Sequence, residues 1–292
     1  MKEETALLGA PPDYQRLCRA VCELKKCEKF KIFSIGRSAL GRNIYAVGAG
    51  KLCSGIIYVG GVHSLEWLTT LLLIKFCFEL SKRKDKLLFL ENRGVIIIPC
   101  LNPDGVELVI NGIESAKEKK ASIARMSNGD LSNWQANANG VDLNHNFDAG
   151  FNELKKLEIK SGILSPSPRR YGGEYPFSEP ETKALASLCR LFDLQVAYAF
   201  HSQGEEIFYQ YGKNTPPRSR LMAELLSQSS GYKLSTQEGL ASHGGFKDWF
   251  IEKMSRPAFT IEIGKGKNPL PITDLDDIYK KLEDMLFLSL GL

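Results

Sequence analysis

Residues 55–67 read GIIYVGGVHSLEW and place two polar side chains directly after an apolar run. The run GIIYVGG is typical of a buried strand, and the helical periodicity after it predicts a strand-to-helix turn. His63 and Glu66 stand three residues apart at this turn, where both side chains could bind one metal ion. The pattern alone is a weak signal, because H-x-x-E also occurs by chance. The rest of the chain must therefore decide whether these residues form a metal site.

The alternation of buried strands and helices continues along the chain. Further strands are predicted at 31–50, 94–100, 194–211 and 256–266, and helices at 67–83, 178–192 and 217–231. Apolar strands separated by helices predict an α/β fold whose sheet is covered on both faces. Since no linker or internal repeat is visible, we expect a single domain over residues 1–292. Between about 106 and 178 the patterns weaken, which predicts long surface loops at one edge of the sheet.

Charge and hydropathy exclude several classes of protein. The net charge of +4 is spread over mixed-charge segments, without the basic stripe of a nucleic-acid-binding protein. The longest apolar candidate, LTTLLLIKFCFEL, is shorter than the ~20 residues that span a bilayer. The first residues, MKEETALLGAPPDYQRL, are acidic where an export signal would be basic, and seven cysteines fit reduced thiols. We therefore expect a cytoplasmic protein with no nucleic-acid and no membrane partner.

Two further polar residues lie at the ends of predicted strands. His201 follows LQVAYAF, and Glu262 lies within FTIEIG. Such side chains can converge, because ligands of open α/β sheets bind at the carboxyl ends of the strands. Two His and one carboxylate are a common catalytic zinc set, which makes His201 the natural third ligand beside His63 and Glu66. A carboxylate buried at Glu262 must be paired, ligated or catalytic, and we favour a general base. Structural histidines and a buried ion pair at Glu262 remain the alternatives.

Six segments occur in a fixed order over nearly the whole chain: GGVHSLEW, LNPDG, GVDLNHNFDAGF, AFHSQGEEI, HGGFKDWF and FTIEIG. Together they resemble the M14 family of zinc carboxypeptidases. The resemblance implies a single α/β domain with a mixed, mainly eight-stranded sheet between helices. It also implies that His63, Glu66 and His201 hold one zinc ion, with Glu262 as the general base. In this family an Arg that precedes GVDLN stabilises the transition state, and Arg125 in ASIARMSNGD is the candidate.

The chain also departs from the family pattern. Asn144 and His145 stand where metallocarboxypeptidases carry Asn-Arg, the pair that binds the terminal carboxylate of a peptide. A neutral imidazole cannot reproduce the bidentate, permanently charged grip of a guanidinium. Leu240 stands where these enzymes have a flexible Tyr. Lys247, in GGFKDW, falls where the family sets its preference for the leaving residue, and its charge would suit a leaving group with an extra carboxylate.

These departures resemble one branch of the family. DLNHNFDAG, RRYGGEYPFSEPET, FHSQGEEI and FTIEIGKGKNPLP look like the γ-D-glutamyl-meso-diaminopimelate peptidases, which cut peptidoglycan stem peptides. The resemblance implies a peptidoglycan-derived peptide as substrate. Exported relatives often carry cell-wall-binding repeats, and since we find neither a repeat nor a signal, we expect a cytoplasmic enzyme that trims recycled or imported muropeptides. Two alternatives stay open: a conventional carboxypeptidase in which His145 binds the carboxylate, and a catalytically dead relative that only binds peptides.

Overall fold

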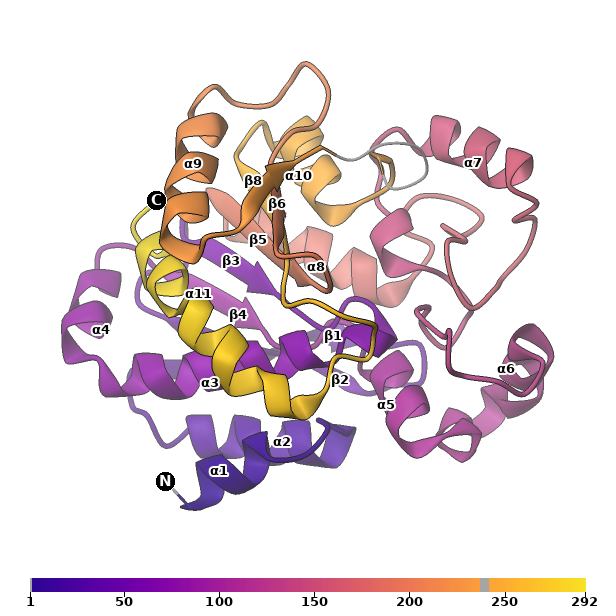
Figure 1. Cartoon of the computed structure of the whole chain (residues 1–292), viewed down its shortest axis with the longest axis horizontal. Coiled ribbons are helices and arrows are strands. Elements are labelled where there is room, and N and C mark those ends of the chain that lie inside the picture. Colours follow the sequence, from indigo (N-terminus) through magenta and orange to yellow (C-terminus); the bar gives the residue numbers. More distant parts are fainter. Residues whose placement is uncertain (1, 237–241) are drawn as a thin grey trace.

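The computed structural model of this protein describes residues 2–236 and 242–292 (Figure 1). The strands are β1 (Phe30–Arg37), β2 (Asn43–Ala49), β3 (Ile56–Val59), β4 (Val95–Ile98), β5 (Val196–His201), β6 (Glu206–Phe208), β7 (Lys233–Ser235) and β8 (Ala258–Glu262). The α-helices are α1 (Lys2–Leu8), α2 (Tyr14–Leu24), α3 (Leu68–Lys82), α4 (Lys84–Leu90), α5 (Pro103–Asn111), α6 (Lys120–Ser127), α7 (Phe151–Lys160), α8 (Pro180–Leu191), α9 (Arg218–Ser230), α10 (Phe246–Met254) and α11 (Leu275–Ser289). Short 3-10 helices are η1 (Ser64–Glu66), η2 (Ile113–Lys119), η3 (Leu143–His145) and η5 (Ile272–Asp274).

The described strands form one mixed sheet in the order β1-β2-β4-β3-β5-β8-β6-β7. The four central strands, β4, β3, β5 and β8, are parallel to one another. The pairs β1/β2, β2/β4 and β6/β8 are antiparallel. This arrangement confirms the predicted α/β fold with an eight-stranded mixed sheet. Because the central strands are parallel, their carboxyl ends lie at one edge of the sheet.

Strand β3 shows why the sheet is covered on both faces. All four of its residues are buried, and their side chains alternate between two apolar clusters. Ile56 and Tyr58 belong to the cluster that includes side chains of α2, α3, α9 and α11. Ile57 and Val59 belong to the cluster that includes side chains of α8 and α10. Neither face of the strand meets water, so its sequence is a continuous apolar run.

The region from about 106 to 178 is more regular than the predicted surface loops. It contains the end of α5 followed by η2, α6, η3 and α7. A third apolar cluster organises its first half, where Leu108, Ile123 and Trp134 are completely buried. Such short helices are stabilised mainly by tertiary packing, which leaves only a weak periodic signal in the sequence. The loop prediction is therefore wrong for these helical segments.

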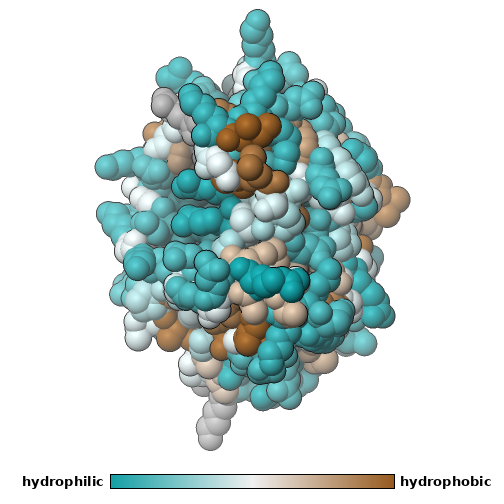
Figure 2. All heavy atoms as spheres, turned by 90° about the vertical axis from the view of Figure 1, so that its right-hand side faces the viewer, coloured by the Kyte–Doolittle hydropathy of each residue, from teal (hydrophilic) through white to brown (hydrophobic). Residues whose placement is uncertain are grey.

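The thiols fit the expectation from composition. All seven cysteines are free. Among the described residues, no helix has both the length and the apolar character needed to cross a membrane. Figure 2 shows the right-hand face of Figure 1, which is largely hydrophilic with small, separate hydrophobic areas. Scattered apolar side chains of this kind are ordinary on a protein surface.

Candidate metal centre

Strand ends and one turn bring the candidate ligands to the carboxyl edge of the sheet. β3 ends at Val59, and His63 follows as the residue that flanks the start of η1. Glu66 is the last residue of η1. His201 is the last residue of β5, and it pairs in register with Glu262, the last residue of β8. The parallel sheet therefore places four side chains from distant parts of the sequence at one edge.

His63, Glu66 and His201 form a compact set of donor atoms. The Nδ1 atoms of His63 and His201 lie 2.9 and 3.0 Å from the two carboxylate oxygens of Glu66. The two Nδ1 atoms are 3.3 Å apart, and the three ligand atoms all lie within 4.8 Å of one another. Two nitrogens bound to one tetrahedral zinc ion at about 2.0–2.1 Å are separated by roughly the same distance. The donor set therefore fits a single metal ion, with two His and one carboxylate as protein ligands.

Asp142 is hydrogen-bonded to Nε2 of the His63 ring, the nitrogen that does not face Glu66. Its Oδ1 accepts a hydrogen bond of 3.0 Å from Nε2 of His63. Since the carboxylate can only accept, the proton of a neutral ring lies on Nε2, and Nδ1 is left free to face the other donors. Burial opposes the charge of Asp142, but interactions with His63 and His145 hold its pKa well below its usual value. No role for Asp142 could be predicted from the sequence, because nothing in GVDLN marks a partner 79 positions away.

The electrostatics of the three candidate ligands favour a bound cation. Burial raises the pKa of Glu66, but the charges of His63 and His201 outweigh it and lower the pKa to about 2. Burial also opposes the charge of His63, yet Glu66 and Asp142 raise its pKa well above its ordinary value. Both shifts arise because buried carboxylates face the imidazoles. A metal cation would balance the negative charge of these carboxylates, as a proton on an imidazole does. The cation would therefore compete with that proton.

Glu262 lies on the wall of a cavity beside these ligands. The cavity has a volume of about 490 Å³, and Glu66, Glu262, Gln135, Arg169, Glu206 and Asn268 are among its lining residues. We call it the metal-side cavity. Burial, together with the charge of Glu66 and a smaller contribution from Glu206, raises the pKa of Glu262 well above its usual value. A partly buried carboxylate with a raised pKa beside a candidate metal site has the properties of a general base.

The structure does not bring Arg125 to this cavity. Arg125 lies in the last turn of α6, is exposed to solvent, and is not among the residues that line the metal-side cavity. Arg169 lines the cavity, and the described residues give its side chain no ion-pair partner. Arg169 follows GVDLN in the chain, whereas the family pattern places its Arg before that segment. The sequence pattern therefore could not indicate Arg169.

Asn144 and His145 lie in η3, and their side chains bind the backbone. The Oδ1 atom of Asn144 accepts a hydrogen bond of 3.1 Å from the N–H of Phe246. The Nδ1–H of His145 donates to the carbonyl of Arg170, also at 3.1 Å. Neither Asn144 nor His145 is among the lining residues of the metal-side cavity. Their role in binding a substrate carboxylate stays a prediction.

Lys247 is buried near the start of α10, and its side chain is 3% exposed. Its Nζ forms an ion pair with Asp248 and donates a hydrogen bond of 2.8 Å to the carbonyl of Gln210. The charge of Lys247 is therefore balanced within the protein, and its contact with a leaving group stays a prediction. Leu240 lies outside the described residues.

Comparison with known proteins identifies the class that this fold and site define. The family model described as zinc carboxypeptidase, Peptidase M14, matches residues 23–285. This chain belongs to that family. The family that the sequence segments indicated is thus confirmed, and the chain is a metallopeptidase and hydrolase of the M14 type.

The chain is also similar in sequence to individual proteins. The chain is 36% identical to gamma-D-glutamyl-L-diamino acid endopeptidase 1 of Lysinibacillus sphaericus, over 92% of this chain and 69% of that protein. It is 32% identical to the uncharacterized protein YqgT of Bacillus subtilis, over 88% of this chain and 70% of that protein. Carboxypeptidase B of Bos taurus is 24% identical over 80% of this chain and 58% of its own length.

Two solved structures show the shared fold. Bovine thrombin-activatable fibrinolysis inhibitor, solved with tick carboxypeptidase inhibitor, matches with a TM-score of 0.73 and 20% identity over 97% of this chain and 98% of that chain. The murein-tripeptide amidase MpaA from Escherichia coli O157 matches with a TM-score of 0.55 and 22% identity over 89% of this chain and 92% of that chain. Both likenesses support the architecture described above.

Proposed function

We propose that this protein is a zinc metallopeptidase that hydrolyses the amide bond between γ-D-glutamate and meso-diaminopimelate in peptidoglycan stem peptides. The observation that carries the proposal is the donor set of His63, Glu66 and His201, with Glu66 lining the same cavity as Glu262. The name of the 36% identical relative, a gamma-D-glutamyl-L-diamino acid endopeptidase, supports both the bond and the leaving group. The cytoplasmic location expected from the sequence stays a prediction.

We propose zinc as the metal, with His63, Glu66 and His201 as its ligands. If zinc is bound by these residues, it would lower the pKa of a water molecule and polarise the scissile carbonyl. The role of Asp142 is to keep the His63 ring in the tautomer that presents Nδ1 to the other ligands, which its 3.0 Å bond to Nε2 supports. The protein therefore supplies both the ligands and their orientation.

Glu262 is proposed to move the proton. Its carboxylate accepts a proton from the attacking water and then donates it to the nitrogen of the leaving diaminopimelate. The oxygen of the water ends in the new γ-carboxylate of D-glutamate, and the amide C–N bond breaks. The raised pKa of Glu262 supports this role, because a carboxylate with an ordinary pKa is a weak base near neutral pH.

Arg169 is proposed to stabilise the negative charge that develops on the carbonyl oxygen. The chemistry requires a preorganised cation or hydrogen-bond donor near that oxygen. Arg169 lines the metal-side cavity, whereas Arg125 does not, so we assign to Arg169 the role that the sequence suggested for Arg125.

The proposal is tested by incubating the zinc-loaded protein with L-Ala-γ-D-Glu-meso-diaminopimelate and analysing the products by mass spectrometry. We expect L-Ala-D-Glu and free diaminopimelate, and no product when a chelator is present. Release of C-terminal residues from ordinary L-peptides, with the tripeptide left intact, would instead identify a conventional carboxypeptidase. Failure to cut either substrate would favour the relative that only binds peptides.

A further inference from the structure

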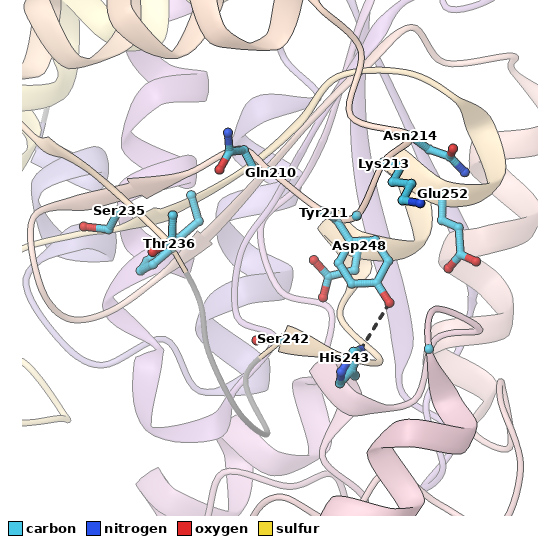
Figure 3. Close-up of a pocket in the computed structure, with 13 residues that line it drawn as sticks. Gln210, Tyr211, Lys213, Asn214, Ser235, Thr236, Ser242, His243, Asp248 and Glu252 are labelled. Carbon is cyan, nitrogen blue, oxygen red and sulfur yellow. Dashed lines mark hydrogen bonds between the residues drawn. The ribbon is translucent and has the colours of Figure 1, made fainter.

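The metal-side cavity continues on one side into the cavity drawn in Figure 3. Phe208 and Thr236 line both cavities, and Asp248 lies on the wall of the second. Lys247, which stands where the family sets its preference for the leaving residue, forms an ion pair with this Asp248. The leaving residue is therefore expected on this side. The acyl part of the substrate, which precedes the scissile amide, then extends along a different wall of the metal-side cavity.

A groove with a volume of about 510 Å³ meets the metal-side cavity at such a wall. Asn268 lines both the groove and the metal-side cavity. We call it the acyl-side groove. Much of its wall is apolar, with Leu65, Trp67, Val109 and Leu131 among the lining residues. Its volume lies within the roughly 300–1,000 Å³ of small-molecule sites, so it can hold a short piece of peptide.

The acyl-side groove is fixed in place beside the metal ligands. Leu65 and Trp67 directly precede and follow Glu66 in the chain. The backbone N–H of Ser202 donates to Oε2 of Glu66 at 3.2 Å. The hydroxyl of Ser202 donates to Oδ1 of Asn268 at 2.8 Å, and Nδ2 of Asn268 donates to the carbonyl of Ser202 at 2.6 Å. Both walls of the groove are thus connected to the same metal ligand.

Lys267 is the single charged residue among the described residues that line the acyl-side groove. It is exposed, and the described part of the chain gives its side chain no ion-pair or hydrogen-bond partner. Lys265, two positions earlier, is instead paired with Glu205 at 3.0 Å. The groove therefore offers one unmatched cation beside an apolar wall. This combination is complementary to a carboxylate that is carried close to a small apolar group.

We propose that the acyl-side groove binds the residues that precede the scissile amide, with Lys267 pairing with the α-carboxylate of D-glutamate and the apolar wall contacting the methyl group of L-alanine. This inference rests on the proposed function, because it assigns a part of that substrate to the groove. A γ-linked glutamate keeps a free carboxylate on its α-carbon, and two methylene groups separate this carbon from the scissile carbonyl. An ordinary α-linked peptide has no carboxylate at that place, so Lys267 would favour the γ linkage.

The test compares three tripeptides that begin with L-alanine and end with meso-diaminopimelate. Their middle residue is γ-linked D-glutamate, γ-linked D-isoglutamine, whose α-carboxylate is amidated, or γ-aminobutyrate, which lacks the α-carboxylate. In the zinc-loaded enzyme we expect kcat/KM to be about fivefold lower for the last two, as for the loss of an exposed ion pair. Lys267→Met should lower kcat/KM about fivefold for the glutamate peptide and leave the other two unchanged. Lys267→Glu should lower it further, because like charges then face each other.

The matched control is Lys265→Met, which removes the same charge from the same segment at a position that does not line either cavity. It should keep the preference for the glutamate peptide. Arg169→Met should lower kcat/KM by a similar factor for all three peptides, since Arg169 is proposed to act on the carbonyl oxygen. If the wild-type enzyme cuts the glutamate and isoglutamine peptides equally well, the inference is overturned while the proposed function stands. A preference that survives in Lys267→Met, or that is lost equally in Lys265→Met, would also overturn it.

A binding measurement separates the inference from the proposed function. Calorimetry with the zinc-loaded protein compares the dipeptides L-Ala-D-Glu and L-Ala-D-isoglutamine, which both keep the γ-carboxylate. We expect L-Ala-D-Glu to bind about fivefold more tightly to the wild type, and the two dipeptides to bind alike to Lys267→Met. If no tripeptide is cut but this Lys267-dependent difference is found, the proposed function fails and the role of the acyl-side groove stands. If the wild type binds both dipeptides alike, or binds neither, that role is overturned.

Discussion

The Nε2 atom of His63 lies 3.0 Å from Oδ1 of Asp142, while Nδ1 of the same ring faces Glu66 at 2.9 Å. The carboxylate of Asp142 is itself fixed, because it accepts hydrogen bonds from the backbone N–H groups of Asn144 and Arg170. Two separate segments therefore determine the orientation of the His63 ring. A carboxylate in this position raises the basicity of a metal-binding imidazole and fixes its tautomer.

Replacing Asp142 with alanine should weaken zinc binding by about 10- to 100-fold. Asp142→Asn should lose less, because the amide keeps an oxygen that can accept from Nε2. Affinity is measured by competition with a chelating dye, and thermal unfolding of the same samples shows whether the variants fold. Asp130→Ala, in an exposed turn, is the control. Unchanged zinc affinity in a folded Asp142→Ala protein would remove Asp142 from the metal site.

Glu262→Gln should abolish turnover and leave metal content near one ion per chain. The amide has nearly the same shape as the carboxylate but cannot accept the proton, and general base catalysis typically contributes about 10²–10⁴-fold. The measurements are the tripeptide assay and metal analysis of the same preparation. Glu224→Gln, on the surface of α9, should keep full activity. Activity that survives in Glu262→Gln would mean that another group is the base.

Arg169→Met should lower kcat by about 10²–10³-fold with a smaller change in KM, because a contact with the developing oxyanion acts mainly in the transition state. Arg125→Met should change kcat little, since Arg125 is exposed on α6 and does not line the metal-side cavity. Both variants are assayed with the same tripeptide. The opposite result, a large loss in Arg125→Met alone, would restore the assignment suggested by the sequence.

Lys247→Met should destabilise the protein by about 3–5 kcal/mol, because it leaves the buried carboxylate of Asp248 without its partner. The double variant Lys247→Met with Asp248→Asn should recover much of this loss, since no uncompensated charge remains. The free energy of unfolding is measured in urea. If Lys247→Met is as stable as wild type but discriminates less well between diaminopimelate and lysine substrates, Lys247 contacts the leaving group directly.

The convergence of the four candidate residues could be predicted from the sequence because they lie at strand ends and at one turn. His63 and Glu66 share one turn, and His201 and Glu262 end two neighbouring parallel strands, so an apolar run followed by a polar residue indicates each position. The strength of these apolar runs also made the central sheet predictable. The short helices between 106 and 178 were missed, because α6 and α7 depend on packing rather than on a long periodic stripe.

Other parts of the site depend on contacts that no local pattern records. Asp142 reaches His63 across 79 positions, and Arg169 enters the metal-side cavity from a segment without regular secondary structure. The sequence gives the charge of Lys247 but not its partner, and the ion pair with the adjacent Asp248 changes what that charge can do. Residue type thus indicates possible chemistry, while tertiary contacts decide which groups remain free for a ligand.

Glu181, in the first turn of α8, is a completely buried carboxylate outside the metal centre. Its Oε1 accepts from the N–H of Ala39 at 2.9 Å, and its Oε2 accepts from Nδ2 of Asn137 at 3.2 Å. Burial above all, and the nearby charges of Asp104 and Glu179, raise its pKa to about 8. An unfolded chain releases this proton near pH ~4.3. Between these two pKa values the folded state binds one proton more than the unfolded state.

The free energy of unfolding should therefore decrease as pH rises from about 4.3 to 8, by up to about 1.4 kcal/mol per pH unit from this group. Glu181→Gln removes the titration, so its stability should depend less on pH across this window, and it should exceed that of wild type near pH 8. Urea unfolding at pH 5, 6.5 and 8 measures the slope, with Glu224→Gln as the control at equal metal content. Metal release at low pH affects all three proteins alike, so the difference between the two variants isolates Glu181. Parallel pH profiles for Glu181→Gln and Glu224→Gln would show that the Glu181 carboxyl does not titrate in this window.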